Sequence, residues 1–380
     1  MLLLVADRAA NRLFLADGWF LGRPVAPFDP PLFSPSQREA LARLEERIRA
    51  GTGAESKFDP ELGWCNRPGS GFGEYRYDWA GARIGQAELA RGKAPGVRRI
   101  VAVGCSMTHG EEVGARESWC ARLDEELEGW EVANLGVAAY GIDQALLRLR
   151  RDGFALDPDE VWLGILPAAG LRVTTHFRPL LDHWSLDVAF KPRFVRTQAG
   201  HLELVASPAA SIEDVSSLLR DQRRFLERLG DDTWVARAPL AYAPRGSSWL
   251  HSSFAARILL TAWERTGRSL APCFDESHAF GSLYTALVRT MAQECAARGV
   301  TFRLILLPGL DDLEERSAAG RGYWEDWAER RRAEGMGVVD LGLVLLQEQG
   351  GLARLFAPQG HYGVEGSAVV ASALARTLVP

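Results

Sequence analysis

Between residues 98 and 170, short apolar runs alternate with helical patterns. Three runs have the length and residue types of buried strands: Ile100–Val103, Glu131–Leu135 and Val161–Leu166. Between them, Glu117–Leu127 and Gly141–Leu149 repeat apolar side chains at helical spacing. Strands separated by single helices pair in parallel through right-handed crossovers. This alternation therefore predicts a parallel sheet covered by helices.

The alternation returns near the C-terminus and completes the expected sheet. Two further strands and three helices are predicted there: Leu283–Arg298 (helix), Thr301–Leu307 (strand), Tyr323–Arg332 (helix), Gly337–Leu341 (strand) and Val364–Leu378 (helix). Five parallel strands with helices between them suit a flavodoxin-like α/β/α sandwich of three layers. We predict this α/β fold class for the chain.

A long interruption separates the two halves of the sheet. The predicted organisation is an N-terminal extension that wraps the core (1–97), a first half of the α/β domain (98–170), an insertion (171–280) and a second half (281–380). Within the insertion, Phe194–Thr197 and His201–Val205 are expected to form a β-hairpin, and 211–229 and 254–266 to be helical. An insertion after the third strand lies at the ligand-binding edge of such a sheet, so it is either a lid or a structural side lobe.

Composition excludes several classes of function. With 380 residues, 47% hydrophobic content and a net charge of −5, the chain is typical of a globular protein and shows no basic footprint for nucleic acid. The five scattered cysteines suggest neither a disulfide framework nor a zinc site, so no metal or cofactor is predicted. No signal peptide or membrane-spanning stretch is visible, which gives a cytoplasmic expectation for the chain as printed. Arginine clusters, such as the one at 330–332, are interleaved with acids and are expected on solvated helix faces.

A serine stands directly after the first predicted strand. The strand ends at Gly104, Ser106 follows, and a helix is expected to begin there. This places the hydroxyl at the carboxyl edge of the sheet, where open α/β sheets bind ligands, beside helix N–H groups that can stabilise an anion. The alternative is an ordinary strand–turn–helix corner with Ser106 as the helix N-cap.

The segment 104–110, Gly-Cys-Ser-Met-Thr-His-Gly, resembles block I of the SGNH (GDSL-type) hydrolases, with Cys105 where the family name has aspartate. Further pieces of the resemblance follow in family order: a lead-in at 58–64 and 81–83, block II at 134–144, and a terminal histidine block at 360–366. The resemblance covers residues 58 to 380 in pieces. It implies the SGNH hydrolase fold and an esterase or deacylase that works through a serine acyl-enzyme.

The resemblance also implies roles for individual residues. Ser106 would be the nucleophile and His361 the base, and the N–H groups of Ser106 and Gly141 would form the oxyanion hole. Two departures from the family pattern are evident, because Ala169 stands at the position of the block III asparagine and Pro358 at that of the aspartate three residues before the histidine. The replacement orienting acid that the sequence offers is Asp340, whose other interpretation is an ordinary strand-terminal aspartate.

Two neighbours of the serine have alternative interpretations. His109 could reach the pocket or lie on the surface of the first helical turn, and Cys105 could be a reactive thiol or a buried, inert one. The substrate implied by the resemblance is an ester of an acylated carbohydrate or small metabolite, and family relatives are often exported. Transfer of the acyl group to a sugar hydroxyl would make the protein an O-acyltransferase. A degenerate domain that binds a ligand or partner without turnover is the alternative suggested by Ala169 and Pro358.

Overall fold

The computed structural model describes residues 2–28, 35–51, 57–181 and 190–378. The chain divides into two compact units, which are treated separately. Unit 1 comprises Met1–Trp64, Thr174–Arg193 and Leu204–Ser269, and unit 2 comprises Cys65–Val173, Phe194–Glu203 and Leu270–Pro380. Unit 1 thus joins the N-terminal residues to most of the predicted insertion. A lid function for residues 171–280 stays a prediction.

Unit 2 contains the predicted sheet. Its strands lie in the order β13-β12-β9-β7-β8 and all pair in parallel. In chain order they are β7 (Arg98–Gly104), β8 (Trp130–Asn134), β9 (Glu160–Ile165), β12 (Thr301–Leu306) and β13 (Gly337–Asp340). This is the 2-1-3-4-5 order of the flavodoxin-like fold. The predicted fold class is confirmed, with each strand within a residue or two of its expected bounds.

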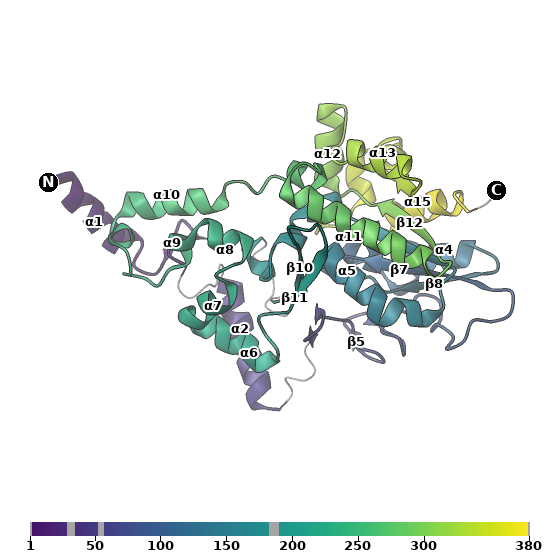
Figure 1. Cartoon of the computed structure of the whole chain (residues 1–380), viewed down its shortest axis with the longest axis horizontal. Coiled ribbons are helices and arrows are strands. Elements are labelled where there is room, and N and C mark those ends of the chain that lie inside the picture. The colour runs from purple at the N-terminus through teal and green to yellow at the C-terminus, as the bar shows by residue number, and fades with distance from the viewer. Residues whose placement is uncertain (1, 29–34, 52–56, 182–189, 379–380) are drawn as a thin grey trace. The chain divides into compact units, whose positions relative to one another are not determined.

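Helices cover both faces of this sheet. Because β8 and β9 flank β7 on opposite sides, right-handed crossovers place α4 (Trp119–Glu126) and α5 (Ile142–Arg148) on opposite faces. The long helix α11 (Ala279–Ala296) packs beside α5, and the last helix α15 (Val364–Ala375) packs beside α4 (Figure 1). The remaining helices of unit 2 are α3 (Ser106–His109), α12 (Leu310–Ala319), α13 (Glu325–Ala333) and α14 (Gly342–Leu346).

Two glycines allow the helix that begins at Ser106 to pack directly against the sheet. Thr108 is fully buried in this helix, and a Cβ atom at Gly104 or Gly164 would lie 2.2 or 2.1 Å from its Oγ1. Real Cβ atoms do not approach so closely, so these strand positions must be glycine. Gly104 also has a φ of +157°, which side chains rarely adopt.

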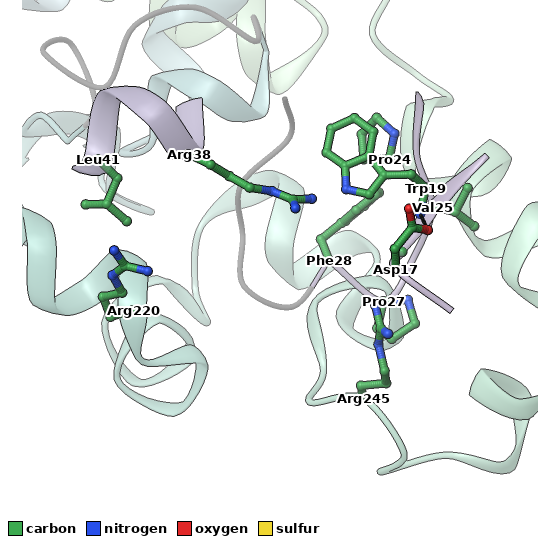
Figure 2. Close-up of a pocket in the computed structure, with 11 residues that line it drawn as sticks. Asp17, Trp19, Pro24, Val25, Pro27, Phe28, Arg38, Leu41, Arg220 and Arg245 are labelled. Atoms are coloured by element: carbon green, nitrogen blue, oxygen red, sulfur yellow. Dashed lines mark hydrogen bonds between the residues drawn. The ribbon is translucent and has the colours of Figure 1, made fainter. Parts of the chain in front are cut away.

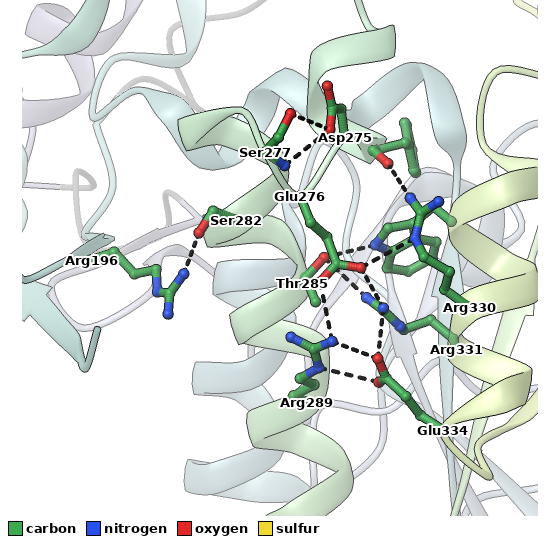
Figure 3. Close-up of polar contacts among 12 residues, drawn as sticks. Arg196, Asp275, Glu276, Ser277, Ser282, Thr285, Arg289, Arg330, Arg331 and Glu334 are labelled. Atoms are coloured by element: carbon green, nitrogen blue, oxygen red, sulfur yellow. Dashed lines mark hydrogen bonds and ion pairs between the residues drawn. The ribbon is translucent and has the colours of Figure 1, made fainter. Parts of the chain in front are cut away.

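An ionic network joins α11 to α13 (Figure 3). The Arg331 guanidinium, which is completely buried, contacts Glu334 at 2.7 Å and also pairs with Glu276, and Arg289 contacts Glu276 at 3.1 Å. The prediction that arginines 330–332 lie on a solvated face is therefore wrong for Arg331. Its burial is stabilised by Thr285 and two carboxylates, which contact the two terminal nitrogens of the guanidinium.

Unit 1 is mainly helical, and one predicted helix is interrupted. The pattern over 211–229 forms two helices that separate at Asp221, whose carboxylate caps the second by accepting from the N–H groups of Arg223 and Arg224. The sequence also predicts Ser34 as the N-cap of a helix that begins at Pro35, and Ser34 lies outside the described residues. The helices are α1 (Leu2–Phe14), α2 (Pro35–Arg49), α6 (Ile212–Arg220), α7 (Gln222–Leu229), α8 (Thr233–Arg237), α9 (Pro239–Tyr242) and α10 (Phe254–Arg265).

Short two-stranded ribbons complete the structure. The predicted hairpin is confirmed, since β10 and β11 form a two-stranded sheet. The ribbons are β1 (Trp19–Phe20) with β2 (Arg23–Pro24), β3 (Phe58–Asp59) with β4 (Gly63–Trp64), β5 (Gly71–Phe72) with β6 (Tyr75–Arg76), and β10 (Arg193–Arg196) with β11 (Leu202–Val205).

A cavity of about 180 Å³ lies within unit 1 and is lined partly by arginines (Figure 2). Arg220 is paired with Glu45 at 2.6 Å, Arg38 lies 5.0 Å over the ring of Trp19, and Arg245 donates to a backbone carbonyl at 2.7 Å. These contacts give each arginine a structural partner within the unit.

Candidate active site

Ser106 lies where the sequence predicted it, at the carboxyl end of β7. Cys105 has extended backbone geometry (ψ −158°) and serves as the N-cap of α3, so Ser106 is the first helical residue. The serine is 7% exposed, and its hydroxyl makes no hydrogen bond to any residue that the structure describes. Cys105 is buried, which agrees with its interpretation as an inert thiol.

His361 reaches the same edge of the sheet through a tight turn. The Ala357 N–H donates to the His361 carbonyl at 2.7 Å, and Phe356 bridges Tyr362. The buried Tyr362 hydroxyl donates to the carbonyl of Pro308 at 2.8 Å, just beyond the end of β12. This hydrogen bond anchors the histidine segment to the carboxyl edge of the sheet, where the loop after Ser106 also lies.

A glutamate, Glu112, holds the imidazole. Its Oε2 lies 2.7 Å from His361 Nδ1 and 3.3 Å from the His361 backbone nitrogen, and its Oε1 accepts from the Gln359 N–H at 2.8 Å. Both side chains are largely buried, with 14% (His361) and 13% (Glu112) exposed. The carboxylate thus orients the ring and the turn that carries it, and Nε2 makes no hydrogen bond within the described chain. No hydrogen bond joins Ser106 Oγ to His361 either.

The prediction that Asp340 orients the histidine is wrong. Its carboxylate accepts from the Gly342 N–H at 2.8 Å and from Trp324 Nε1 at 3.1 Å. Burial raises the pKa of this carboxyl group. Asp340 is therefore the ordinary strand-terminal aspartate of the alternative interpretation, and its bonds fix the start of α14.

Glu112 itself is positioned by side chains from the preceding loops. Its backbone has a φ of +67°, a conformation that costs a non-glycine residue free energy and is concentrated at functional sites. The Tyr75 hydroxyl accepts from the Glu112 N–H at 2.9 Å. The buried Arg83 guanidinium lies 4.6 Å over the Tyr75 ring and donates to the carbonyls of His109, Gly110, Val113 and Gly114. The loop between Ser106 and Glu112 is thereby held in one shape.

His109 is buried, so the prediction that it lies on the surface is wrong. Its Nε2 lies 3.1 Å from the Tyr77 hydroxyl, and its ring packs edge-on against Tyr75 at 4.9 Å. Burial raises the pKa of the Tyr77 hydroxyl. The aromatic environment removes His109 from the solvent and makes it part of the support for the loop.

The predicted oxyanion hole is incomplete in this structure. The Gly141 N–H donates to Gln144 Oε1 at 3.2 Å, which is the capping interaction at the start of α5. Ala169 has no side-chain donor, and its own N–H donates to the Leu166 carbonyl at 2.9 Å. The resemblance also assigns the Ser106 N–H, at the start of α3, to the hole. This N–H makes no comparable hydrogen bond to a described residue.

Sequence reasoning missed Glu112 because the acid was sought near the histidine, where the family has it. A signal was present nonetheless: Glu112 follows the serine by six positions, in the loop that leaves the same strand. Loops at the carboxyl edge of a parallel sheet converge, so a carboxylate there was a candidate partner for His361.

Two features are absent from the described residues. No group of three or more histidine, cysteine, aspartate or glutamate side chains there is arranged to hold a metal ion. None of the helices described has the length and apolar character needed to cross a bilayer.

The fold and site together define a flavodoxin-like α/β/α protein with a serine and a carboxylate-bound histidine at the carboxyl edge of its sheet. No protein-family model matches the chain, and no curated protein matches it. Among solved structures it is similar to a lipolytic protein of the G-D-S-L family from Desulfitobacterium hafniense, at 13% identity, over 73% of this chain and 98% of that one, with a TM-score of 0.37.

Two further solved structures show similarity of the same order. One is a catalytic mutant of Axe2, an acetylxylan esterase from Geobacillus stearothermophilus, at 14% identity, over 75% of this chain and 95% of that one, with a TM-score of 0.38. The other is TesA, at 12% identity, over 74% of this chain and 99% of that one, with a TM-score of 0.36. TM-scores this low do not establish a common fold or activity. The flavodoxin-like architecture is identified from the strand order of the sheet.

Proposed function

We propose that the protein is a serine hydrolase that cleaves ester bonds, with Ser106 as nucleophile, His361 as general base and Glu112 as the orienting acid. The observation that carries the proposal is the 2.7 Å contact between Glu112 Oε2 and His361 Nδ1. A carboxylate on Nδ1 holds the tautomer in which Nε2 can accept a proton. This is the third of the groups that serine catalysis needs, and it is present although Pro358 stands at the family position for it.

The chemistry follows from these positions. Ser106 Oγ attacks the carbonyl carbon of the ester while its proton moves to His361 Nε2, and the carbonyl oxygen becomes an oxyanion. Collapse of this intermediate expels the alcohol oxygen, which takes the proton from Nε2 and leaves an acyl-serine. Water then attacks the acyl group and gives a proton to Nε2. The second tetrahedral intermediate collapses, Ser106 Oγ leaves the acyl carbon and takes that proton from Nε2, and the carboxylic acid is released. Glu112 stabilises the imidazolium that forms twice.

The substrate class comes from the sequence resemblance and is part of the proposal: an ester of an acylated carbohydrate or small metabolite. The same acyl-enzyme would serve an O-acyltransferase if a sugar hydroxyl replaced water in the second half-reaction. Product analysis with and without added sugar acceptors separates the two, since only the transferase forms a new ester.

The test is covalent labelling of the full chain. A fluorophosphonate probe is expected to label the wild type on Ser106, identified by mass spectrometry of the labelled peptide, and to leave Ser106→Ala unlabelled. Hydrolysis of p-nitrophenyl acetate should fall to background in Ser106→Ala and in His361→Ala. A wild type that neither reacts with the probe nor hydrolyses the ester would contradict the proposal.

The second candidate is a domain that binds a ligand or partner without turnover. It is favoured by one specific contact, the engagement of the Gly141 N–H by Gln144 at 3.2 Å, together with the lack of a side-chain donor at Ala169. An inert wild type in the labelling experiment would support this alternative.

A further inference from the structure

A small cavity lies at the place where the oxyanion hole is expected. It is bounded by residues from the exits of β7 and β9, from the start of α5 and from α11: Gly104, Cys105, Tyr140, Gly141, Ile142, Gly164, Ile165, Leu166, Ala169 and Tyr284. These include the residue before Ser106, and also Gly141 and Ala169. Its volume of about 10 Å³ is of the order that a single water needs. The cavity is therefore sized for one small group, such as an oxygen atom, next to the residue that precedes Ser106.

Tyr284 brings a polar side chain to this otherwise largely apolar cavity. The residue is 1% exposed, and its ring is packed against Phe274 at 5.3 Å and Trp327 at 5.7 Å. Its hydroxyl makes no hydrogen bond to any residue in the described part of the chain. Polar groups inside proteins that have no protein partner are commonly completed by a ligand or a water.

Tyr284 lines the cavity together with Cys105, which precedes Ser106, and with Gly141 and Ala169. Burial raises the pKa of Tyr284 well above its ordinary value, so the group remains a protonated donor at neutral pH. Tyrosine hydroxyls are among the side chains that form oxyanion holes.

We propose that the Tyr284 hydroxyl donates a hydrogen bond to the oxyanion formed when Ser106 attacks, and supplies the side-chain donor that Ala169 lacks. The inference rests on the proposed function, because it assigns a residue to the same reaction. Tyr284 transfers no proton: its O–H bond stays intact while the carbonyl oxygen gains negative charge and then loses it. The donor comes from α11, whereas the position that the family uses, Ala169, lies in the segment after β9.

The experiment compares rates for Tyr284→Phe and the wild type. The substitution removes one oxygen atom and keeps the ring contacts. Both kcat for p-nitrophenyl acetate and the rate of fluorophosphonate labelling should fall about 10²–10³-fold, because both reactions place negative charge on the same oxygen. KM should change less than about threefold. The matched control is Tyr242→Phe. It removes a buried hydroxyl in unit 1, whereas Tyr284 belongs to unit 2, and it should keep the wild-type rates.

A rescue variant distinguishes a catalytic role from a structural one. Adding Ala169→Asn to Tyr284→Phe returns a side-chain donor from the β9 loop and should recover at least about tenfold in kcat. If Tyr284→Phe does not fold, 3-fluorotyrosine at position 284 of the otherwise native chain replaces it. Its fluorine resonance should shift when Ser106 is phosphonylated.

The outcomes separate this inference from the proposed function. Wild-type rates in Tyr284→Phe, with Ser106→Ala inactive, would overturn the role of Tyr284 and leave the hydrolase in place. An unshifted fluorine resonance on phosphonylation would do the same. A wild type that does not react with the fluorophosphonate would overturn both.

Discussion

Replacing Glu112 by glutamine tests the contact on which the site assignment depends. The side chain now makes three contacts with the histidine turn: Oε2 with the His361 Nδ1 and backbone nitrogen, and Oε1 with the Gln359 N–H. Glutamine keeps the size but has one acceptor oxygen and one NH₂ group. Whichever way the amide turns, one of these donors faces an NH₂ group, and the negative charge beside the imidazolium is lost.

The magnitude follows from these losses. In a serine protease triad, changing the orienting carboxylate to its amide lowers kcat about 10⁴-fold. The side chains of Glu112 and His361 are 13% and 14% exposed, so water can partly solvate the imidazolium. We therefore expect a 10³- to 10⁴-fold loss in kcat, which is about 4–5.5 kcal/mol of transition-state stabilisation. KM should change little, because the contacts of Glu112 are with the turn that carries His361 and it acts through the imidazole.

The assay is steady-state hydrolysis of p-nitrophenyl acetate, with thermal unfolding to verify the fold of each variant. Glu111→Gln is the matched control: it makes the same chemical change one residue away, where the carboxylate lies 3.1 Å from His109 Nδ1 instead of contacting His361. Its kcat should stay within about tenfold of the wild type. Equal kcat values for Glu112→Gln and the wild type, with Ser106→Ala inactive, would refute the assignment of Glu112.

Three further results are expected. Asp340→Asn should keep kcat within about threefold, because its carboxylate contacts Gly342 and Trp324; a loss above tenfold in the ester assay would restore Asp340 as a candidate. Gly164→Ala should lower the free energy of unfolding by about 1–3 kcal/mol through its clash with Thr108, and adding Thr108→Ala should return most of this in denaturant titrations. Burial lowers the pKa of His176 from 6.5 to about 3. The unfolded chain therefore binds the proton more readily than the folded chain. The contribution of neutral His176 to the free energy of unfolding is complete above pH 6.5 and is lost as the pH falls toward 3. Between pH 7.5 and 4.5 the free energy of unfolding should fall by about 3 kcal/mol. An equal pH dependence of unfolding in His176→Gln would exclude the histidine as its cause.

The parts of the site that were predictable are those attached to regular elements. Ser106 could be placed because an apolar strand ending in Gly104 must deliver the next residues to the sheet edge. His361 could be placed through the resemblance of its segment, which precedes the last helix. The orienting acid was not predictable in this way, because Glu112 depends on the shape of an irregular loop, and a φ of +67° cannot be read from a glutamate in a sequence.

Buried polar side chains show the same division. The composition of the segments around Arg83, His109 and Arg331 is that of surface loops and helices, and the structure buries all three. Each is held by partners that are mostly distant in sequence: loop carbonyls for Arg83, a tyrosine hydroxyl for His109, and Thr285 and Glu276 together with the nearby Glu334 for Arg331. Local patterns carry no information about such partners.

The amino-acid sequence alone determined the five strands, their parallel pairing and the edge at which Ser106 lies, because hydrophobic periodicity and crossover handedness act locally. Only the tertiary structure decided that Glu112 holds His361 and that Tyr284 lines the same cavity as Ala169. Those contacts join residues from different loops and helices, and their distances depend on how the whole sheet packs.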